Sequence, residues 1–258
     1  MAEKSKFDTE TTARHYASAR PSYPSELFDT LDNLLGHKLA GASVVDVAAG
    51  TGISSRQLAE RGARVIAVEL SGAMIAELAA ASPGVRAVQG SGHALPLADG
   101  SADLITYAQA WHWMDPAQAL PEIRRVLRPG GVFALWWNQT DRSTGWAREQ
   151  VDRISAVVPG WDRDDTVDSA RGAAVDKTLP YKHTFRFTWQ RTVPIETHLS
   201  NLASKSYIAE LGDDLEPFLD SERRTLTERF PGGEVVEHFS TLLVATLPNV
   251  ELSISARS

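Results

Sequence analysis

The stretch SVVDVAAGTG, residues 43–52, decides the fold of this chain, because a short apolar strand runs there directly into a glycine-rich turn. Gly50 and Gly52 let the backbone approach a ligand without an intervening Cβ atom, and the N–H groups that open the following helix favour polar or negative groups. The next apolar strand ends in Glu69, seventeen residues after Gly52. An acidic side chain there can accept hydrogen bonds from both hydroxyls of a ribose. The pattern predicts a nucleotide-binding turn.

Two classes of nucleotide ligand use this order of strand, turn, helix and acid. A dinucleotide site favours Gly-x-Gly-x-x-Gly, in which the third glycine allows close helix packing beneath a pyrophosphate. Ser55 stands at that third position, which argues against a dinucleotide. An oxidoreductase with a nicotinamide cofactor is therefore the less favoured alternative.

Composition narrows the class of protein. With 258 residues, 43% hydrophobic and 23% charged, the chain has the make-up of a globular protein with one core, or a core and a modest cap. A net charge of -7 argues against a nucleic-acid partner, which needs a basic face. The lack of cysteine excludes disulfides and thiolate metal sites, and no His, Asp and Glu cluster has ligand spacing, so we expect no metal.

The sequence does not indicate a membrane protein. No apolar run approaches the roughly 20 residues of a membrane span, and the N-terminus lacks a hydrophobic signal core, so we expect a cytoplasmic location. The expected partner is a small molecule. The oligomeric state is left open.

Strand-like and helix-like patterns alternate along the chain as in a doubly wound sheet. Predicted strands cover 43–47, 64–69, 85–89, 103–108, 132–137, 183–192 and 235–247. Predicted helices cover 26–35, 54–61, 72–80, 116–127, 195–210 and 213–230, and the irregular stretch 141–176 predicts an inserted helix and a loop over the site. We expect an α/β fold with a Rossmann-like, seven-stranded, mostly parallel sheet, helices on both faces and a small helical cap. Residues 1–140 would supply a lid segment and the cofactor-binding core, and residues 141–258 the cap and the closing strands of one domain.

Three stretches of this pattern resemble the class I S-adenosylmethionine-dependent methyltransferases. Their motif I commonly reads Asp-x-Gly-x-Gly-x-Gly and is matched here, with alanine at the first glycine, by Asp46, Ala48, Gly50 and Gly52. GSGHALPL at 90–97 is similar to their Gly-Asp-Ala-Glu-x-Leu-Pro-Phe loop, and RVLRPGG at 125–131 to the turn before their fifth strand. The resemblance covers residues 43–137 in order and at normal spacing. It implies S-adenosylmethionine as cofactor and S-adenosylhomocysteine as product.

The resemblance and the strand-end positions together place residues around this cofactor. Asp46 either orders the glycine turn or meets the cofactor amine, and Met74 is either a core residue or a contact of the adenine. The loop after the third strand normally holds the adenine, and Ser91 replaces its common aspartate. The predicted cofactor contacts are Tyr16, Arg20, Asp46, Ala48, Gly50, Gly52, Glu69, Leu70, Met74, Ser91, Gly92, His93, Gln109 and Ala110.

Two further stretches narrow the resemblance. The pattern Tyr-x-x-x-Arg-Pro-x-Tyr-Pro at 16–24 and AQAWHW at 108–113 are similar to small-molecule enzymes of the trans-aconitate methyltransferase type. A segment ahead of the first strand can fold across the carboxyl ends of the sheet as a lid. Tyr16 and Arg20 would then reach a carboxylate of the cofactor or of the substrate, for which a guanidinium offers a two-point contact.

The implied reaction is an in-line displacement of a methyl group from a sulfonium, in which alignment is worth about 7–11 kcal/mol. His112 is the candidate general base, and a packed structural role is its alternative. A carboxylate acceptor would need no base. Substrate contacts are predicted for the ends of the fourth and fifth strands and for the later helices, at Trp111, Trp113, Asn138 and Tyr207. A protein that uses the pocket for binding, or for another sulfonium reaction, is the remaining alternative.

Overall fold

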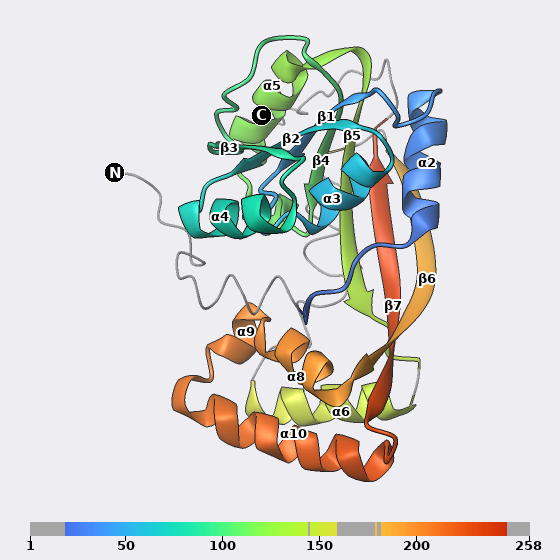
Figure 1. Cartoon of the computed structure of the whole chain (residues 1–258), viewed down its shortest axis with the longest axis vertical. Helices are drawn as coiled ribbons and strands as arrows, with labels where there is room; N and C mark the ends of the chain where they lie inside the picture. The colour runs from blue at the N-terminus through green and yellow to red at the C-terminus, as the bar shows by residue number, and fades with distance from the viewer. Residues whose placement is uncertain (1–18, 144, 159–178, 180–181, 247–258) are drawn as a thin grey trace, which may run out of the picture.

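The computed structural model describes residues 19–143, 145–158, 179 and 182–246, and these form one seven-stranded sheet with helices on both faces (Figure 1). The strand order is β3-β2-β1-β4-β5-β7-β6, in which β7 runs antiparallel to both of its neighbours and the other strands share one direction. The predicted fold class is confirmed. The strands are β1 (Ser43–Val47), β2 (Arg64–Glu69), β3 (Arg86–Gln89), β4 (Ala102–Ala108), β5 (Leu127–Thr140), β6 (His183–Pro194) and β7 (Glu234–Ala245).

The helices follow the predicted alternation, but several bounds differ, and the 3₁₀ helix Trp111–Trp113 was not predicted. The predicted helix 195–210 is divided, because the Ser204 hydroxyl donates to the carbonyl of Asn201 and ends the first helix there. The predicted helix 213–230 opens with a 3₁₀ turn, and the predicted helix 116–127 ends one residue early. The helices are α2 (Ser25–Leu35), α3 (Ile53–Glu60), α4 (Gly72–Ala81), η1 (Trp111–Trp113), α5 (Pro116–Val126), α6 (Gly145–Val157), α8 (Ile195–Ala203), α9 (Ser206–Ala209), η3 (Gly212–Asp214) and α10 (Leu215–Arg229).

Two apolar layers hold the sheet between its helices. One face packs on α5, whose buried side chains include Leu120, Ile123 and Val126. The other face packs on α2, α3 and α4, and its core includes Phe28 and Leu58. Because both faces are covered, the central strands are mostly apolar, as is usual for parallel strands, with Asp46 and Thr106 as buried polar exceptions.

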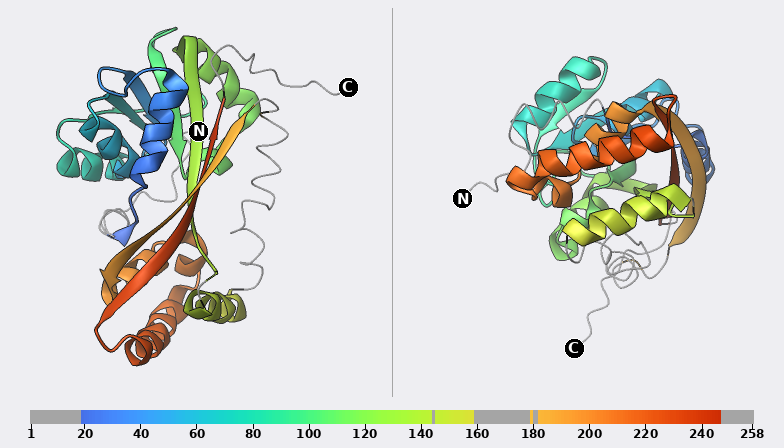
Figure 2. Two further views of the ribbon diagram at one scale, coloured as in Figure 1. Left: turned by 90° about the vertical axis from the view of Figure 1, so that its right-hand side faces the viewer. Right: turned by 90° about the horizontal axis from the view of Figure 1, so that it is seen from below.

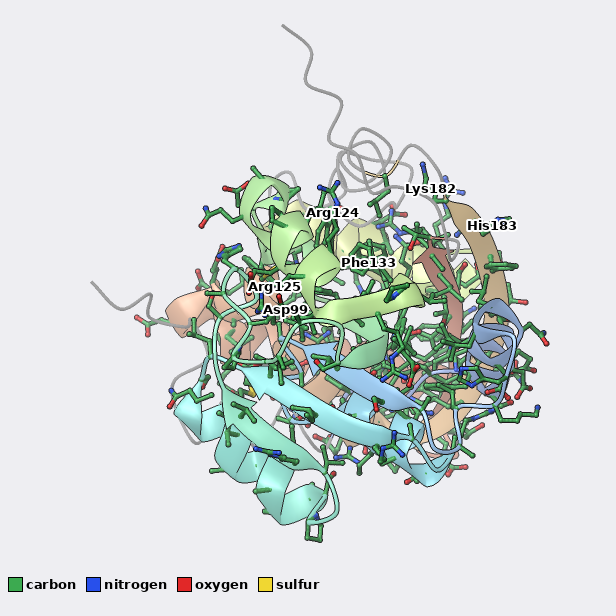
Figure 3. The ribbon with its side chains drawn as sticks, turned by 90° about the horizontal axis from the view of Figure 1, so that it is seen from above. Asp99, Arg124, Arg125, Phe133, Lys182 and His183 are labelled. Atoms are coloured by element: carbon green, nitrogen blue, oxygen red, sulfur yellow. The ribbon has the colours of Figure 1, made fainter. Side chains whose placement is uncertain are left out.

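The ends of the strands differ in their surroundings. At the amino-terminal end, Figure 3 shows Arg125 of α5 beside Asp99, to which it is bonded at 2.7 Å. The same guanidinium bonds Glu122 and the carbonyls of Leu95 and Leu97, so it fastens the loop before β4 to α5. This end of the sheet is thereby closed by structural contacts, and the opposite, carboxyl end faces the remaining helices.

The carboxyl end of the sheet faces a separate group of helices, α6, α8, α9, η3 and α10, which we call the cap (Figure 1). Figure 2 shows β6 and β7 as a long ribbon that runs from the sheet into the cap. The cap has its own apolar core, which includes Ile154, Leu199, Ile208, Leu226 and Val235. In the described part of the chain, no helix has the length and apolar character needed to cross a membrane.

Candidate functional site

The glycine turn between β1 and α3 is shaped by left-handed backbone conformations. Ala48, Gly50 and Gly52 have φ values of 52°, 58° and 80°. A Cβ atom on Gly52 would lie 2.7 Å from Cγ of Leu78, so glycine is required there for packing against α4. For Gly50, in contrast, no described atom lies within 4 Å of the position of a Cβ atom. The side of the turn at Gly50 is therefore open to a ligand.

Asp46 is buried beneath this turn, with an exposed fraction of 0%. Its carboxylate accepts hydrogen bonds from the hydroxyls of Ser55 at 2.6 Å and Thr106 at 2.7 Å. Burial raises the pKa of Asp46 to about 6, although both hydroxyl hydrogen bonds act to lower it. We considered two roles for Asp46, ordering the glycine turn or binding the cofactor amine. These contacts are those of a residue that orders the turn. They also explain Ser55 at the position of the third glycine.

Glu69 closes the turn from the end of β2. Its Oε2 atom accepts from the N–H of Gly50 at 2.9 Å, and Oε1 accepts from the N–H groups of Leu70 and Ser71, each at 2.9 Å. A carboxylate offers about four acceptor positions, so about one remains, on the oxygen that faces Gly50. The Ser71 hydroxyl in turn accepts from the N–H of Met74 and caps α4, where Met74 is buried. Glu69 thus holds the turn in place and also offers a hydrogen-bond acceptor beside the open side of the turn.

The loop after β3 is seated between β1 and β4. Gly92 is buried, and a Cβ atom on it would lie 2.7 Å from Sδ of Met114. The Tyr107 hydroxyl donates to the Gly92 carbonyl at 3.3 Å. His93 is fixed because its Nε2 atom accepts from the N–H of Asp115 at 2.9 Å, and the Ser91 hydroxyl accepts from the His93 N–H at 3.2 Å. The predicted adenine loop is therefore held in place by contacts with β4 and with the residue that precedes α5, and by one hydrogen bond within the loop.

Gln109 follows β4 with a φ of 59°, a left-handed conformation that is unusual for a residue other than glycine. Its N–H donates to the carbonyl of Trp136 at 2.8 Å, and its side-chain amide donates to the carbonyl of Asn138 at 3.2 Å. The following Ala110 is buried. Strained backbone of this kind clusters at functional sites, which agrees with the predicted place of Gln109 at the ligand.

The tryptophans near His112 have different surroundings. Trp111 is 3% exposed and packs edge-on against Tyr107 and Phe133 in the core, whereas Trp113 is 49% exposed. The indole N–H of Trp137 donates to Nδ1 of His112 over a long 3.5 Å. The indole ring of Trp113 is therefore about half exposed to solvent, whereas the ring of Trp111 is part of the core.

The remaining predicted contacts lie toward the cap. Arg20 donates to the carbonyl of Ser204 at 2.9 Å, and Tyr207 is half-buried in α9 with the Lys205 ammonium 5.8 Å from its ring centre. Asn138 donates from its side-chain amide to the carbonyl of Ser22 at 2.8 Å. Tyr16 lies outside the described residues.

Thr51, between the two glycines, is a site residue that sequence reasoning did not single out. Its side chain is buried, with 1% of the residue exposed, and its hydroxyl has no hydrogen-bond partner among the described residues. A buried hydroxyl without a partner is costly, and a ligand can supply the missing bond only if the turn moves enough to expose it. The position of Thr51 between two glycines is the sequence feature that could have identified it.

The donors and acceptors around the open side of the turn fit a nucleoside with a polar tail. Glu69 suits ribose hydroxyls, and the Thr51 hydroxyl and the first N–H groups of α3 suit a carboxylate. Among the described residues, no group of three or more His, Asp or Glu side chains is arranged to hold a metal ion.

Comparisons with known proteins point to one family. Residues 45–135 match the family model described as a methyltransferase domain. An uncharacterized methyltransferase of Mycobacterium tuberculosis is 39% identical over 196 residues, which cover 74% of each chain. The solved structure of a putative type II methyltransferase from Anaeromyxobacter dehalogenans covers 89% of this chain and 99% of its own, with a TM-score of 0.69 and 24% identity. That structural likeness shows the shared fold.

Proposed function

Because this chain belongs to the S-adenosylmethionine-dependent methyltransferases, we propose that it transfers the methyl group to a small-molecule acceptor at the carboxyl end of the sheet, beneath the cap. The observation that carries this proposal is the arrangement of Glu69 beside the open side of Gly50. Both lie where parallel strands present their ligands.

Each part of the cofactor has a proposed partner in this chain. Glu69 receives the ribose through its remaining acceptor position, so a second ribose hydroxyl would have to replace the Gly50 N–H. Thr51 and the N–H groups of the turn receive the methionyl part, and residues 91–93 with Leu70 and Met74 surround the adenine. Asp46 acts through Ser55 and Thr106, which keep the turn in shape.

The bound cofactor supplies an electrophilic methyl group on a positively charged sulfur. The protein then has to align the acceptor and keep competing water away, and alignment of this kind is worth about 7–11 kcal/mol. The cap is the element that covers the carboxyl end of the sheet (Figure 1). The exposed Trp113 ring provides an apolar surface for the acceptor, and an aromatic face also stabilises a nearby cation.

His112 is the candidate catalytic residue for an acceptor that must lose a proton. In neutral imidazole one nitrogen accepts and the other donates, so the bond from Trp137 to Nδ1 places the ring hydrogen on Nε2. A base role therefore requires that the weak Trp137 bond be given up. His112→Ala should lower turnover at least tenfold with a phenol or amine acceptor while leaving the affinity for S-adenosylhomocysteine unchanged. Unchanged turnover would refute the base role.

We base the proposed substrate class on the resemblance to enzymes of the trans-aconitate methyltransferase type. Residues 16–24 and 108–113 support an acceptor of the kind used by enzymes similar to trans-aconitate methyltransferase, a small organic molecule that bears a carboxylate. A carboxylate acceptor needs no base, so its methylation should be insensitive to His112→Ala.

The direct test is to incubate the protein with methyl-labelled S-adenosylmethionine and a panel of small acids, phenols and amines. We expect label in an acceptor and S-adenosylhomocysteine in equal amount. Methylthioadenosine as the product would mean attack on the aminobutyryl chain and would contradict methyl transfer. Gly50→Val is the blocked control, because its side chain would fill the open side of the turn at a φ of 58°.

A further inference from the structure

Residues 19–24, which we call the strap, join the cap to the sheet. In Figure 1 the strap runs from beside α8 and α9 past the carboxyl end of the sheet to α2. Its backbone is held by side chains from three elements, Gln57 of α3, Asn138 of β5 and Arg191 of β6. Asn138 and Arg191 lie more than 100 positions from the strap residues that they contact, so local sequence preference does not explain the strap's course.

The end of the strap at Tyr23 is fixed to the sheet. The side-chain amide of Gln57 accepts from the N–H of Tyr23 at 2.9 Å and donates to its carbonyl at 2.8 Å. The Tyr23 ring is buried and packs edge-on against Trp136, with ring centres 5.8 Å apart. The Tyr23 side chain is therefore part of the apolar core that covers this face of the sheet.

The opposite end of the strap is fixed by Arg191 of β6, where β6 and β7 run into the cap. Its guanidinium donates to the carbonyl of Ala19 at 2.8 Å and, through Nε, to Glu237 at 2.5 Å. Glu237 is 4% exposed. Its carboxylate also forms hydrogen bonds with the ring of His198 at 2.7 Å and with the side-chain amide of Asn201 at 3.2 Å. Burial alone would raise the pKa of Glu237, but the contacts with His198 and Arg191 lower it overall. The carboxylate thus stays charged and keeps the guanidinium directed at the strap.

The middle of the strap is linked to the proposed cofactor site by Asn138. Its side-chain oxygen accepts from Thr241 at 2.5 Å, which leaves the amide group to donate to the carbonyl of Ser22 at 2.8 Å. The backbone carbonyl of Asn138 accepts from the side chain of Gln109, the strained residue at the end of β4. One residue therefore touches both the strap and a predicted cofactor contact.

We infer that Asn138 and Arg191 are positioning residues that hold the strap across the carboxyl end of the sheet, so that cofactor binding at Gln109 is transmitted to the strap. This rests on the proposed function, because it takes S-adenosylmethionine or its product as the ligand. Asn138 was predicted as a substrate contact, and its assignment here is different: both polar ends of its side chain are engaged by the protein.

The test compares hydrogen–deuterium exchange of the strap in the whole protein with and without S-adenosylhomocysteine. Asn138→Asp turns the donor to Ser22 into an acceptor, and Arg191→Lys keeps a cation beside Glu237 but loses the two-pronged geometry. Arg223→Lys is the matched control, because Arg223 bonds Glu196 and Asp220 on the exposed side of the cap. Melting temperatures identify variants that fold.

In the wild-type protein the ligand should slow exchange of the strap at least tenfold. In both test variants we expect strap exchange in the free protein to be at least tenfold faster, and ligand affinity by calorimetry to be five- to tenfold weaker. The control should match the wild type. Wild-type exchange in the test variants, or faster exchange at unchanged affinity, would overturn the inference. Failure of the wild type to bind the ligand would instead refute the proposed function, while exchange in the free protein would still test the anchors.

Discussion

Asp46 should make the stability of this protein depend on pH in a way that a single substitution removes. Burial raises the pKa of its carboxyl from 3.8 to about 6. One pKa unit corresponds to about 1.4 kcal/mol, so the ionised carboxylate should cost the folded state about 3 kcal/mol. A raised folded-state pKa favours folding below 3.8, and that advantage is lost as the pH rises through 6.

Asp46→Asn removes this titration while leaving a side chain of the same shape to meet the hydroxyls of Ser55 and Thr106. Relative to the wild type, the free energy of unfolding of Asp46→Asn should therefore increase by about 2 kcal/mol between pH 4.5 and pH 8, the part of the total that lies in this range. Urea denaturation at several pH values measures the difference. Asp213→Asn, at an exposed position, controls for the loss of one acidic group.

A difference between Asp46→Asn and wild type that is constant from pH 4.5 to pH 8 would refute this reasoning. So would a difference that shrinks as the pH rises, because it would mean that the ionised carboxylate is favoured by its two hydroxyl partners more than it is penalised by burial. The Asp213→Asn control should show no trend of comparable size.

Other substitutions in the turn separate packing from ligand contact. Gly52→Ala should lower the free energy of unfolding by about 2 kcal/mol, because its Cβ atom would lie 2.7 Å from Leu78 at a φ of 80°, and urea denaturation measures this. Gly72→Ala, whose Cβ atom has no described neighbour within 4 Å, should be neutral or slightly stabilising in the same assay. Thr51→Val should raise the free energy of unfolding by about 1–3 kcal/mol, since it removes a buried hydroxyl that has no partner among the described residues, but should weaken S-adenosylhomocysteine binding about tenfold in calorimetry. Unchanged affinity would remove Thr51 from the site.

The sequence predicted best the elements whose limits are set by local signals. The bounds of β1 and β2 agree with the prediction to the residue, because each apolar run is bounded by a turn or by the acidic Glu69. Strand β5 was predicted for residues 132–137 but extends over Leu127–Thr140. The extension at residues 138–140 comes from pairing with β7, in which Thr140 lies opposite Phe239, a partner about 100 residues away, and at the other end Leu127 pairs with Ala102 of β4. Local apolar pattern does not carry that information.

The candidate site shows the same division. The glycine turn and Glu69 could be read from their spacing, because backbone conformation and strand order fix their places. The partners of Asp46 could not, since Thr106 reaches it from another strand. The role of Asn138 also depends on the strap, which is brought to it only by folding. Residues that act through distant partners are the ones that the sequence does not reveal.

The central claim is that a nucleoside cofactor lies at the open side of the glycine turn with its ribose at Glu69. Calorimetric titration with S-adenosylhomocysteine of the wild type, Glu69→Ala and Glu60→Ala tests it directly, with Glu60 as an exposed glutamate on the neighbouring α3. We expect the wild type and Glu60→Ala to bind alike and Glu69→Ala to bind about 10- to 100-fold more weakly, as for the loss of a hydrogen bond to a charged group. Equal binding by all three proteins, or no binding by the wild type, would contradict the claim.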